Sequence, residues 1–203
     1  MPTLPVWWAL PTLLALLIGC APGVTYVVDV AYTPALKEQV QIQAEPIQIA
    51  VIPFDDERAD KKGIGKRSRL TGQVDEFEIR PYPVTTAVTE ALISALKIHG
   101  YQTKLLPRGT DETGITGVPP HIILSGKIEE LRADAISKPG YTDIKTSIRL
   151  KVRVYRVDDK SSSTVTIQSQ TEPRVALFNP NVMQSAINEA LTEAINKLVA
   201  QRL

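Results

Sequence analysis

A dense group of charged side chains follows an apolar segment in the first third of the chain. The segment from Ile47 to Phe54 is apolar at nearly every position, and the charges come directly after it: Asp55, Asp56, Glu57, Arg58, Asp60, Lys61 and Lys62. Carboxylate oxygens are suitable ligands for a divalent cation, but three bases lie among these acids and would compete with the ion. The group is therefore either a solvated loop whose charges pair with one another or a docking loop for a partner. Its candidate contacts are Asp56, Arg58 and Asp60.

Three bases alternate with apolar residues in a second segment, where Leu150 and Val152 separate Arg149, Lys151 and Arg153. Because successive side chains of a strand point to opposite faces, these bases share one face of a predicted strand. We expect polar neighbours on the adjoining strands: Thr166, Gln168 and Gln170 on one, Lys127 and Glu129 on the other. Such a face is either the solvated side of an antiparallel sheet or a docking surface for an acidic partner, peptidoglycan or anionic lipid headgroups.

The residue sets that usually support catalysis are missing from the sequence. It has no Gly-x-Ser-x-Gly elbow, no His-Glu-x-x-His helix and no Cys-x-x-Cys pair. We expect His99 to cap a helix end and His121 to be an ordinary strand residue. Glu129 and Glu130 are adjacent on a predicted strand and point to opposite faces unless a bulge intervenes, which disfavours a glycosidase pair. The chain is predicted to be non-enzymatic, with no cofactor and no metal ion.

The segment from Gly63 to Ser68 matches a phosphate-binding loop only in part. The Walker pattern requires Ser or Thr directly after the lysine, where Arg67 stands, and a first glycine where Asp60 stands. No helix is expected directly after the segment to present its N-terminus to an anion. Nucleotide binding is therefore not expected.

The N-terminal segment indicates where in the cell the protein is located. No charged side chain occurs from Met1 to Val28, and an apolar stretch from Val6 to Ile18 is interrupted only by Pro11 and Thr12. Its length suits the core of a secretory signal, about 7–15 residues, and falls short of the roughly 20 residues of a spanning helix. The stretch ends in Leu17-Ile18-Gly19-Cys20, which resembles the lipobox of bacterial lipoproteins.

The lipobox resemblance implies a diacylglyceryl thioether on Cys20, cleavage before it and acylation of the new amine, which together anchor a protein stably. The alternative is that Cys20 is a small apolar residue of a membrane-spanning segment. The segment departs from a usual signal because no Lys or Arg precedes the apolar stretch. Ala21 stands where an Asp would retain a lipoprotein in the inner membrane, so the resemblance implies a lipid anchor at the periplasmic face of an outer membrane.

Hydrophobic periodicity in the remainder predicts an α/β (α+β) two-layer sandwich. Helices are expected from Val84 to His99 and from Asn179-Pro180 to about Gln201. Strands are expected over 47–54, 101–106, 121–136, 141–157 and 164–171, with loops over 55–78 and 107–120. A change of phase near Glu129-Glu130 indicates a bulge. The result is a mostly antiparallel sheet of about five strands with two helices on one face, in the order β-α-β-β-β-β-α.

The last two strands are expected to form a hairpin that pairs Val154 with Val165 and Val152 with Ile167, which keeps all four side chains on one face.

Length and composition limit the remaining possibilities. The 203 residues divide into a signal peptide over 1–19, a lipidated cysteine with a tether over 20–46, and one α/β domain over 47–203. The apolar part of the tether, Val24 to Tyr32, is also able to form a short strand or pack on the domain. The net charge of +1 argues against a nucleic-acid partner. A single cysteine excludes a disulfide framework.

The pattern as a whole resembles the YajG-like family of uncharacterised bacterial lipoproteins over about residues 47–200. The resemblance rests on the lipobox, the strand Ile49 to Phe54, the motif Asp56-x-Arg58-x-Asp60 leading to Ile64-Gly65, and the helix containing Asn188-Glu189-Ala190-Leu191. It implies an envelope location and a fold, but no activity. The leading hypothesis is a lipid-anchored adaptor or assembly factor that contacts an envelope protein. The alternative is an auxiliary lipoprotein of an envelope transporter that binds a lipid or another apolar ligand.

Overall fold

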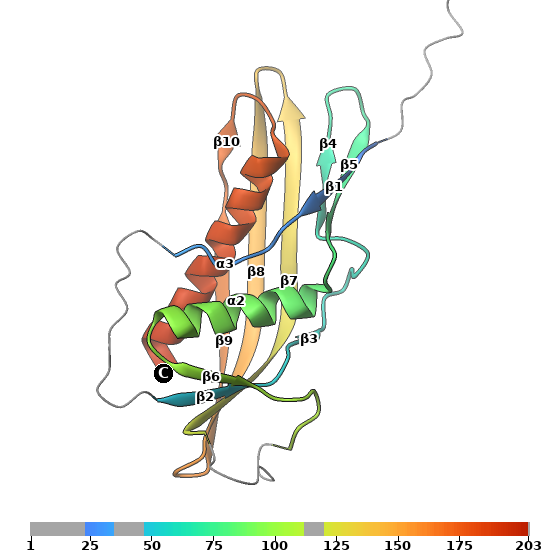
Figure 1. Ribbon diagram of the computed structural model, residues 1–203. Helices are drawn as coiled ribbons and strands as arrows, with labels where there is room; N and C mark the ends of the chain where they lie inside the picture. Colours follow the sequence, from blue (N-terminus) through green and yellow to red (C-terminus); the bar gives the residue numbers. More distant parts are fainter. Residues whose placement is uncertain (1–22, 35–46, 112–119, 203) are drawn as a thin grey trace, which may run out of the picture.

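The computed structural model describes residues 23–34, 47–111 and 120–202. Within them the chain forms one mixed sheet and two helices (Figure 1). The strands are β1 (Thr25–Val28), β2 (Gln48–Val51), β3 (Asp55–Asp56), β4 (Gly65–Ser68), β5 (Val74–Ile79), β6 (Gln102–Leu105), β7 (Ile122–Lys138), β8 (Tyr141–Arg156), β9 (Ser161–Thr171) and β10 (Arg174–Val175). The helices are α2 (Val84–Ile98) and α3 (Pro180–Arg202).

The long strand β7 is the centre of the sheet. One edge of β7 pairs in parallel with β2, β3 and β4 in turn, and its other edge pairs with β8 in an antiparallel ladder that runs its whole length. Outside these, β6 lies parallel to β2, and β5 joins β4 to β1. The hairpin β8–β9 continues the antiparallel part. The single strand β7 therefore connects the parallel part of the sheet, on one of its edges, to the antiparallel part on the other.

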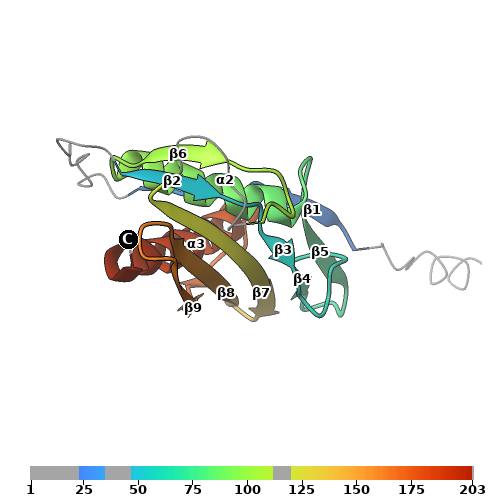
Figure 2. The same cartoon turned by 90° about the horizontal axis from the view of Figure 1, so that it is seen from below.

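Both helices cover the same face of the sheet. The inward side chains of β8, including Ile148, Leu150 and Val152, form one buried cluster with Leu92 of α2 and Leu191 of α3. In Figure 2 the helices lie on one side of β7, β8 and β9. Asn179 caps α3 by accepting a hydrogen bond from the Asn181 amide at 2.9 Å. The two predicted helices and their common face are confirmed.

The predicted sheet of about five mostly antiparallel strands is wrong in size and in pairing. Ten strands occur in the described residues, and five of their nine pairings are parallel. The predicted loop over 55–78 contains the short strand β3 and the hairpin β4–β5. Hydrophobic periodicity does not predict this hairpin because two of its inward side chains, Arg67 and Asp75, are charged. In the structure these two side chains form an ion pair at 3.6 Å.

The hairpin register was predicted two residues out. The structure pairs Val152 with Val165 and Leu150 with Ile167. A shift of two residues leaves every side chain on its predicted face, so alternation alone does not fix the register. The predicted bulge is confirmed, because the β7–β8 register shifts between Ile128 and Glu130. The turn between β7 and β8 contains Gly140 at φ 84°, a backbone conformation that favours glycine.

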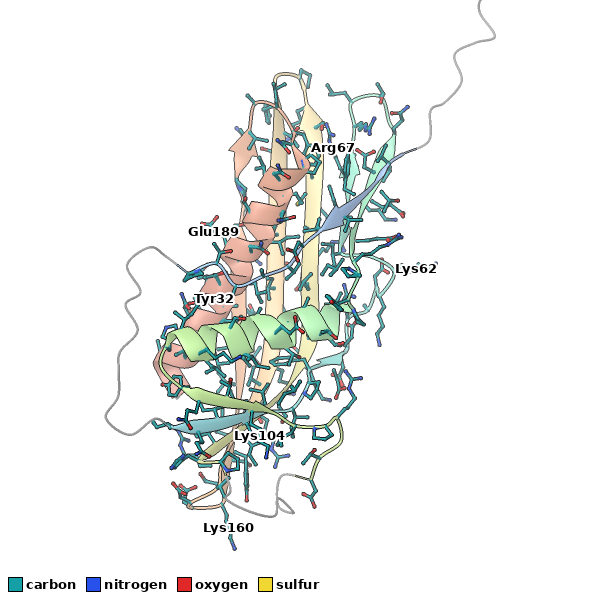
Figure 3. The ribbon with its side chains drawn as sticks, in the orientation of Figure 1. Tyr32, Lys62, Arg67, Lys104, Lys160 and Glu189 are labelled. Atoms are coloured by element: carbon teal, nitrogen blue, oxygen red, sulfur yellow. The ribbon has the colours of Figure 1, made fainter. Side chains whose placement is uncertain are left out.

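Part of the predicted tether belongs to the folded domain. Val28, Val30 and Tyr32 are at most 8% exposed, and β1 lies parallel to β5. After β1 the chain runs along α3, where side chains spaced four residues apart bind it (Figure 3). The amides of Asp29, Ala31 and Thr33 donate to Gln184, Asn188 and Thr192, and the Tyr32 hydroxyl donates to Asn196. Residues 23–34 are therefore a structural element of the domain.

Candidate functional site

Arg58 organises the charged loop that the sequence singled out. Its guanidinium donates to both carboxylate oxygens of Asp56 at 3.0 Å and to the Gly63 carbonyl at 2.8 Å. The side chain is only 5% exposed. Burial alone would raise the pKa of Asp56, but the hydrogen bonds and the charge of Arg58 outweigh it and hold that pKa below its usual value. Arg58 thus shapes the loop from within, and Asp60 lies at its exposed edge.

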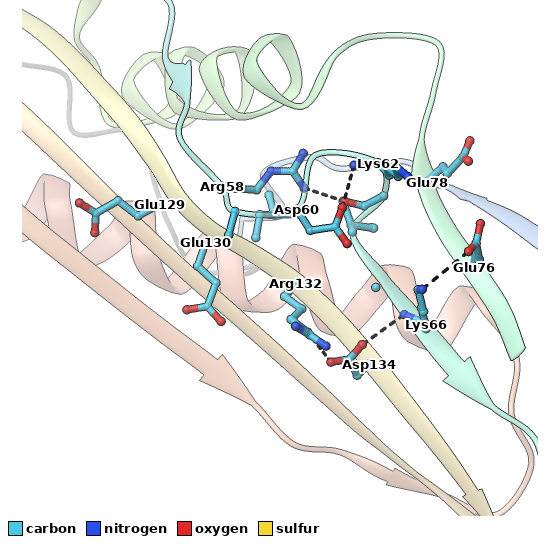
Figure 4. A pocket seen from close by; sticks show the side chains of 15 residues that line it. Arg58, Asp60, Lys62, Lys66, Glu76, Glu78, Glu129, Glu130, Arg132 and Asp134 are labelled. Carbon is cyan, nitrogen blue, oxygen red and sulfur yellow. Dashed lines mark hydrogen bonds and ion pairs between the residues drawn. The ribbon is translucent and has the colours of Figure 1, made fainter.

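A charged groove opens beside this loop. It has a volume of about 540 Å³ and lies between the loop, the hairpin β4–β5 and the bulged part of β7 (Figure 4). Six acids and four bases line it, which leaves a surplus of two negative charges; the acids are Asp60, Glu76, Glu78, Glu129, Glu130 and Asp134, and the bases are Arg58, Lys62, Lys66 and Arg132. Several of them pair with a neighbour on the same wall, among them Lys66 with Glu76 in the β4–β5 hairpin at 3.9 Å and Arg132 with Asp134 on β7 at 2.5 Å. The lining is built for polar contacts.

The bulge in β7 brings Glu129 and Glu130 to the same groove. The sequence placed them on opposite faces unless a bulge intervened, and the bulge does intervene. The Glu130 carboxylate accepts a hydrogen bond from Ser147 and lies 3.9 Å from the Arg149 guanidinium. These contacts tie Glu130 to the adjacent strand.

The predicted basic face is present on β8. Arg149, Lys151 and Arg153 are exposed and point away from the helices, while Leu150 and Val152 between them are buried. Gln168, Thr166 and Thr164 lie opposite Arg149, Lys151 and Arg153, so Thr166 and Gln168 are neighbours of the bases as expected, while the register shift places Gln170 opposite Ser147. On the β7 side the partners are Glu130, Lys127 and Ser125.

A second hollow, of about 260 Å³, lies at the end of this basic face that is nearer the β8–β9 turn. Lys127, Lys151 and Arg153 border it together with one acid, Asp55, and the backbone of Ile52, Pro53 and Gly126 forms part of its wall. Lys127 also pairs with Glu57 at 2.5 Å. The structure therefore brings Asp55, the first residue of the charged loop, to the basic face of β8 at a hollow with a net positive lining, whereas Arg58 and Asp60 line the other groove.

The remaining predictions concern isolated residues. His99 caps α2, and its Nδ1 lies 2.8 Å from the Ala95 carbonyl. His121 accepts a hydrogen bond from the Gln48 amide at 3.1 Å and serves the strand pairing. The segment Gly65–Ser68 is a strand, and the next element is the strand β5 rather than a helix. Among the described residues no group of three His, Cys, Asp or Glu side chains is placed to hold a metal ion.

A buried carboxylate that the sequence did not reveal fixes the beginning of the domain. Asp75 on β5 is fully buried; it accepts hydrogen bonds from Arg69 at 2.8 Å and from the Val24 amide at 3.0 Å. Arg67 lies next to it and stacks on the Phe178 ring at 3.9 Å. Burial would raise the pKa of Asp75, but the bonds from Arg69 and Val24 lower it. A lone Asp in a strand pattern gives no sign of this role.

Cys20, the predicted lipidation site, lies outside the described residues. In the part of the chain that the structure covers, neither helix has the length and apolar character needed to cross a membrane.

Comparison with known proteins identifies a fold and no family. No family model and no curated protein sequence matches the chain. The fold is similar to that of protein XCC0632 from Xanthomonas campestris, which carries the DUF330 family label; the TM-score is 0.51 and the identity 14%, over 87% of this chain and 93% of that one. A lipoprotein from Neisseria meningitidis, GNA1162, aligns with a TM-score of 0.42 and 11% identity over 77% of this chain and all of that one. The structural similarity does not single out the YajG-like family.

Proposed function

We propose that this protein is a non-enzymatic lipoprotein of the cell envelope, anchored by lipid on Cys20 at the periplasmic face of an outer membrane. Its lipobox-like segment Leu17 to Cys20 and its apolar leader support the anchor. The fold shared with the DUF330 protein is consistent with membership of an uncharacterised bacterial family, of which the YajG-like proteins are our proposed relatives.

The protein acts as an adaptor by binding an acidic segment of another envelope protein. One observation carries this proposal: Lys127, Lys151 and Arg153 converge on a hollow in the sheet face that the helices leave uncovered. Three bases against one acid favour an anionic partner, and a hollow of about 260 Å³ is large enough to accept one or two side chains. From the neighbouring loop, Asp55 reaches this hollow, whereas Arg58 and Asp60 line the charged groove beside β4 and β5.

The alternative, a carrier of lipid or another apolar ligand, receives less support. The layer between helices and sheet is filled by side chains, among them Ile148, Leu191 and Ile195, each at most 2% exposed. The groove and the hollow described above are both lined by charges. An apolar ligand requires mostly apolar walls.

Photo-crosslinking in native membranes tests the adaptor role. A photoreactive residue replaces Thr166, which is exposed and lies opposite Lys151. We expect one specific adduct, which is lost when Lys151→Gln and Arg153→Gln are introduced together. The matched control neutralises two exposed lysines away from the hollow, Lys104→Gln and Lys145→Gln, and should leave the adduct intact. An adduct that persists in the Lys151/Arg153 variant, or no adduct from a folded and anchored protein, contradicts the proposal.

A further inference from the structure

The folded domain begins almost at the proposed anchor. Gly23 lies against the first residue of β5, so closely that a Cβ on it would come within 1.6 Å of the Val74 carbonyl oxygen. The Val24 amide is bound to Asp75, and the Val24 carbonyl accepts a hydrogen bond from Glu76. Cys20 is three residues before Gly23. Three residues span at most about 11 Å when fully extended.

One end of the molecule therefore lies beside the point where the chain leaves for Cys20. It is the upper end in Figure 1, where the β4–β5 turn, the β7–β8 turn and the connection from β10 to α3 come together. We call this the anchor end and define it by residues 23–25, 67–75, 136–143 and 174–178. The opposite end carries the β8–β9 turn with Lys160.

Apolar side chains are exposed at the anchor end to an unusual degree. Of the eight large apolar side chains that are exposed in the described residues, five belong to it: Val24, Leu70, Val74, Ile136 and Leu177. Leu70 is 63% exposed and Leu177 is 84% exposed. Both lie in connections between elements, where polar residues are the rule, so packing within the domain does not account for them.

The charges of the anchor end are mostly positive. Its segments contain four bases, Arg67, Arg69, Lys138 and Arg174, against the two acids Asp75 and Asp143. Asp75 is fully buried and Asp143 is paired with Lys138 and Arg174 at 2.8 and 2.7 Å. A surplus of two positive charges beside exposed leucines matches a surface of anionic lipid headgroups.

We infer that the anchor end rests on the bilayer, with Leu70 and Leu177 among the lipid headgroups and the long strands β7 and β8 directed away from the membrane. The inference rests on the proposed anchor at Cys20. A flexible spacer would let the domain turn freely, but a link of about 11 Å beside a structured Gly23 does not. The occupant of this apolar and basic end is the phospholipid surface.

Fluorescent labelling of the full-length lipidated protein tests the orientation. Cys20 is the only cysteine and its sulfur is consumed by lipidation, so an introduced cysteine is the single reactive thiol. An environment-sensitive probe is attached to Leu70→Cys, to Leu177→Cys and, as the control at the opposite end, to Lys160→Cys. The proteins are reconstituted in phosphatidylethanolamine–phosphatidylglycerol vesicles that contain brominated lipid.

We expect the probes at 70 and 177 to shift to shorter emission wavelengths and to lose at least half of their intensity to the brominated lipid, with no change at 160. If the protein floats with the vesicles and all three probes stay in water, the orientation is wrong while the anchor stands. A wavelength shift at 70 and 177 without quenching means that a second copy covers this end and also overturns the inference. A protein whose mass lacks the lipid and that does not float overturns both the anchor and the orientation.

Discussion

Arg58 shows how a residue chosen for its charge can serve a structural purpose. The sequence left open whether charges such as Asp56 and Arg58 pair with one another or face a partner. In the structure the guanidinium is buried and spans from Asp56 to Gly63. Sequence gives the order of charges along a loop but not the path of the loop, and the path decides which charges turn inward. On β8 the path is that of a regular strand, so Arg149, Lys151 and Arg153 could be assigned to one face from their spacing alone.

Replacing Arg58 tests its role inside the loop. Arg58→Ala should lower the free energy of unfolding by about 1–3 kcal/mol, because it leaves the Asp56 carboxylate and the Gly63 carbonyl without their donor. The measurement is urea denaturation at neutral pH. The control is Arg80→Ala, which breaks an exposed pair with Glu78 and should cost less than about 0.5 kcal/mol. Equal losses in the two variants would contradict the structural role.

Asp75 predicts how stability depends on pH. Its pKa is lowered in the folded state, so between that pKa and the ordinary value of about 4 the unfolded state binds more protons than the folded state. The stabilisation is therefore present above about pH 4 and is lost as the pH falls through the lowered pKa. Urea denaturation between pH 7 and pH 2.5 should show a steeper loss in the natural protein than in Asp75→Asn. If the free energy of unfolding falls equally with pH in both proteins, Asp75 does not contribute to the pH dependence of stability.

At the scale of elements, the contact between residues 29–33 and α3 depends on matching repeats. Two residues of extended chain advance about 6.6 Å and four residues of helix advance about 6.0 Å. Alternate amides of Asp29, Ala31 and Thr33 therefore meet Gln184, Asn188 and Thr192 in succession. The sequence shows the polar spacing on the helix, but only the structure shows which segment uses it, because the binding atoms of that segment belong to the backbone.

The Asn188 side chain both accepts a hydrogen bond from residues 29–33 and donates one to them. It accepts from the Ala31 amide at 3.0 Å and donates to the Asp29 carbonyl at 3.3 Å. Asn188→Ala should increase the rate of hydrogen exchange over residues 29–33 by about five- to tenfold, since one or two hydrogen bonds of about 0.5–1.5 kcal/mol are removed. Glu189→Ala, an exposed neighbour on α3, is the control and should leave the rate unchanged. An unaltered rate in Asn188→Ala would show that packing alone holds the segment.

The elements that could be predicted share a property. α2, α3, β7 and β8 are long and place apolar residues at most of their inward positions, which makes their period visible. β3 and β4 have two and four residues and consist mainly of charged and polar side chains, so no apolar period emerges. Their pairing is decided by tertiary contacts such as the approach of Gly65 to Ala133, where an added Cβ would come within 1.7 Å of the carbonyl oxygen.

For the molecule as a whole, the structure moves the start of the domain from residue 47 to residue 23. A chain that begins at Ile47 should be less stable than one that begins at Gly23 by several kcal/mol, because burying each large apolar side chain contributes about 1.5–3 kcal/mol and Val28, Val30 and Tyr32 would be lost. Thermal unfolding of the two purified chains measures the difference. If the two chains unfold at the same midpoint temperature, residues 23–46 do not stabilise the domain and its boundary lies at residue 47, as expected from the sequence.

The parallel pairing of β1 with β5 also determines how the protein responds to mechanical load. Tension on the chain before Gly23 is directed along β1, whereas its hydrogen bonds to β5 and the bonds of the following segment to α3 lie across that direction. Bonds loaded in this shear geometry share the force and rupture together, while an antiparallel hairpin pulled from its open end separates one pair at a time. The segment that leads to the proposed anchor at Cys20 therefore enters the domain through a strand arrangement that distributes a pulling force over several hydrogen bonds.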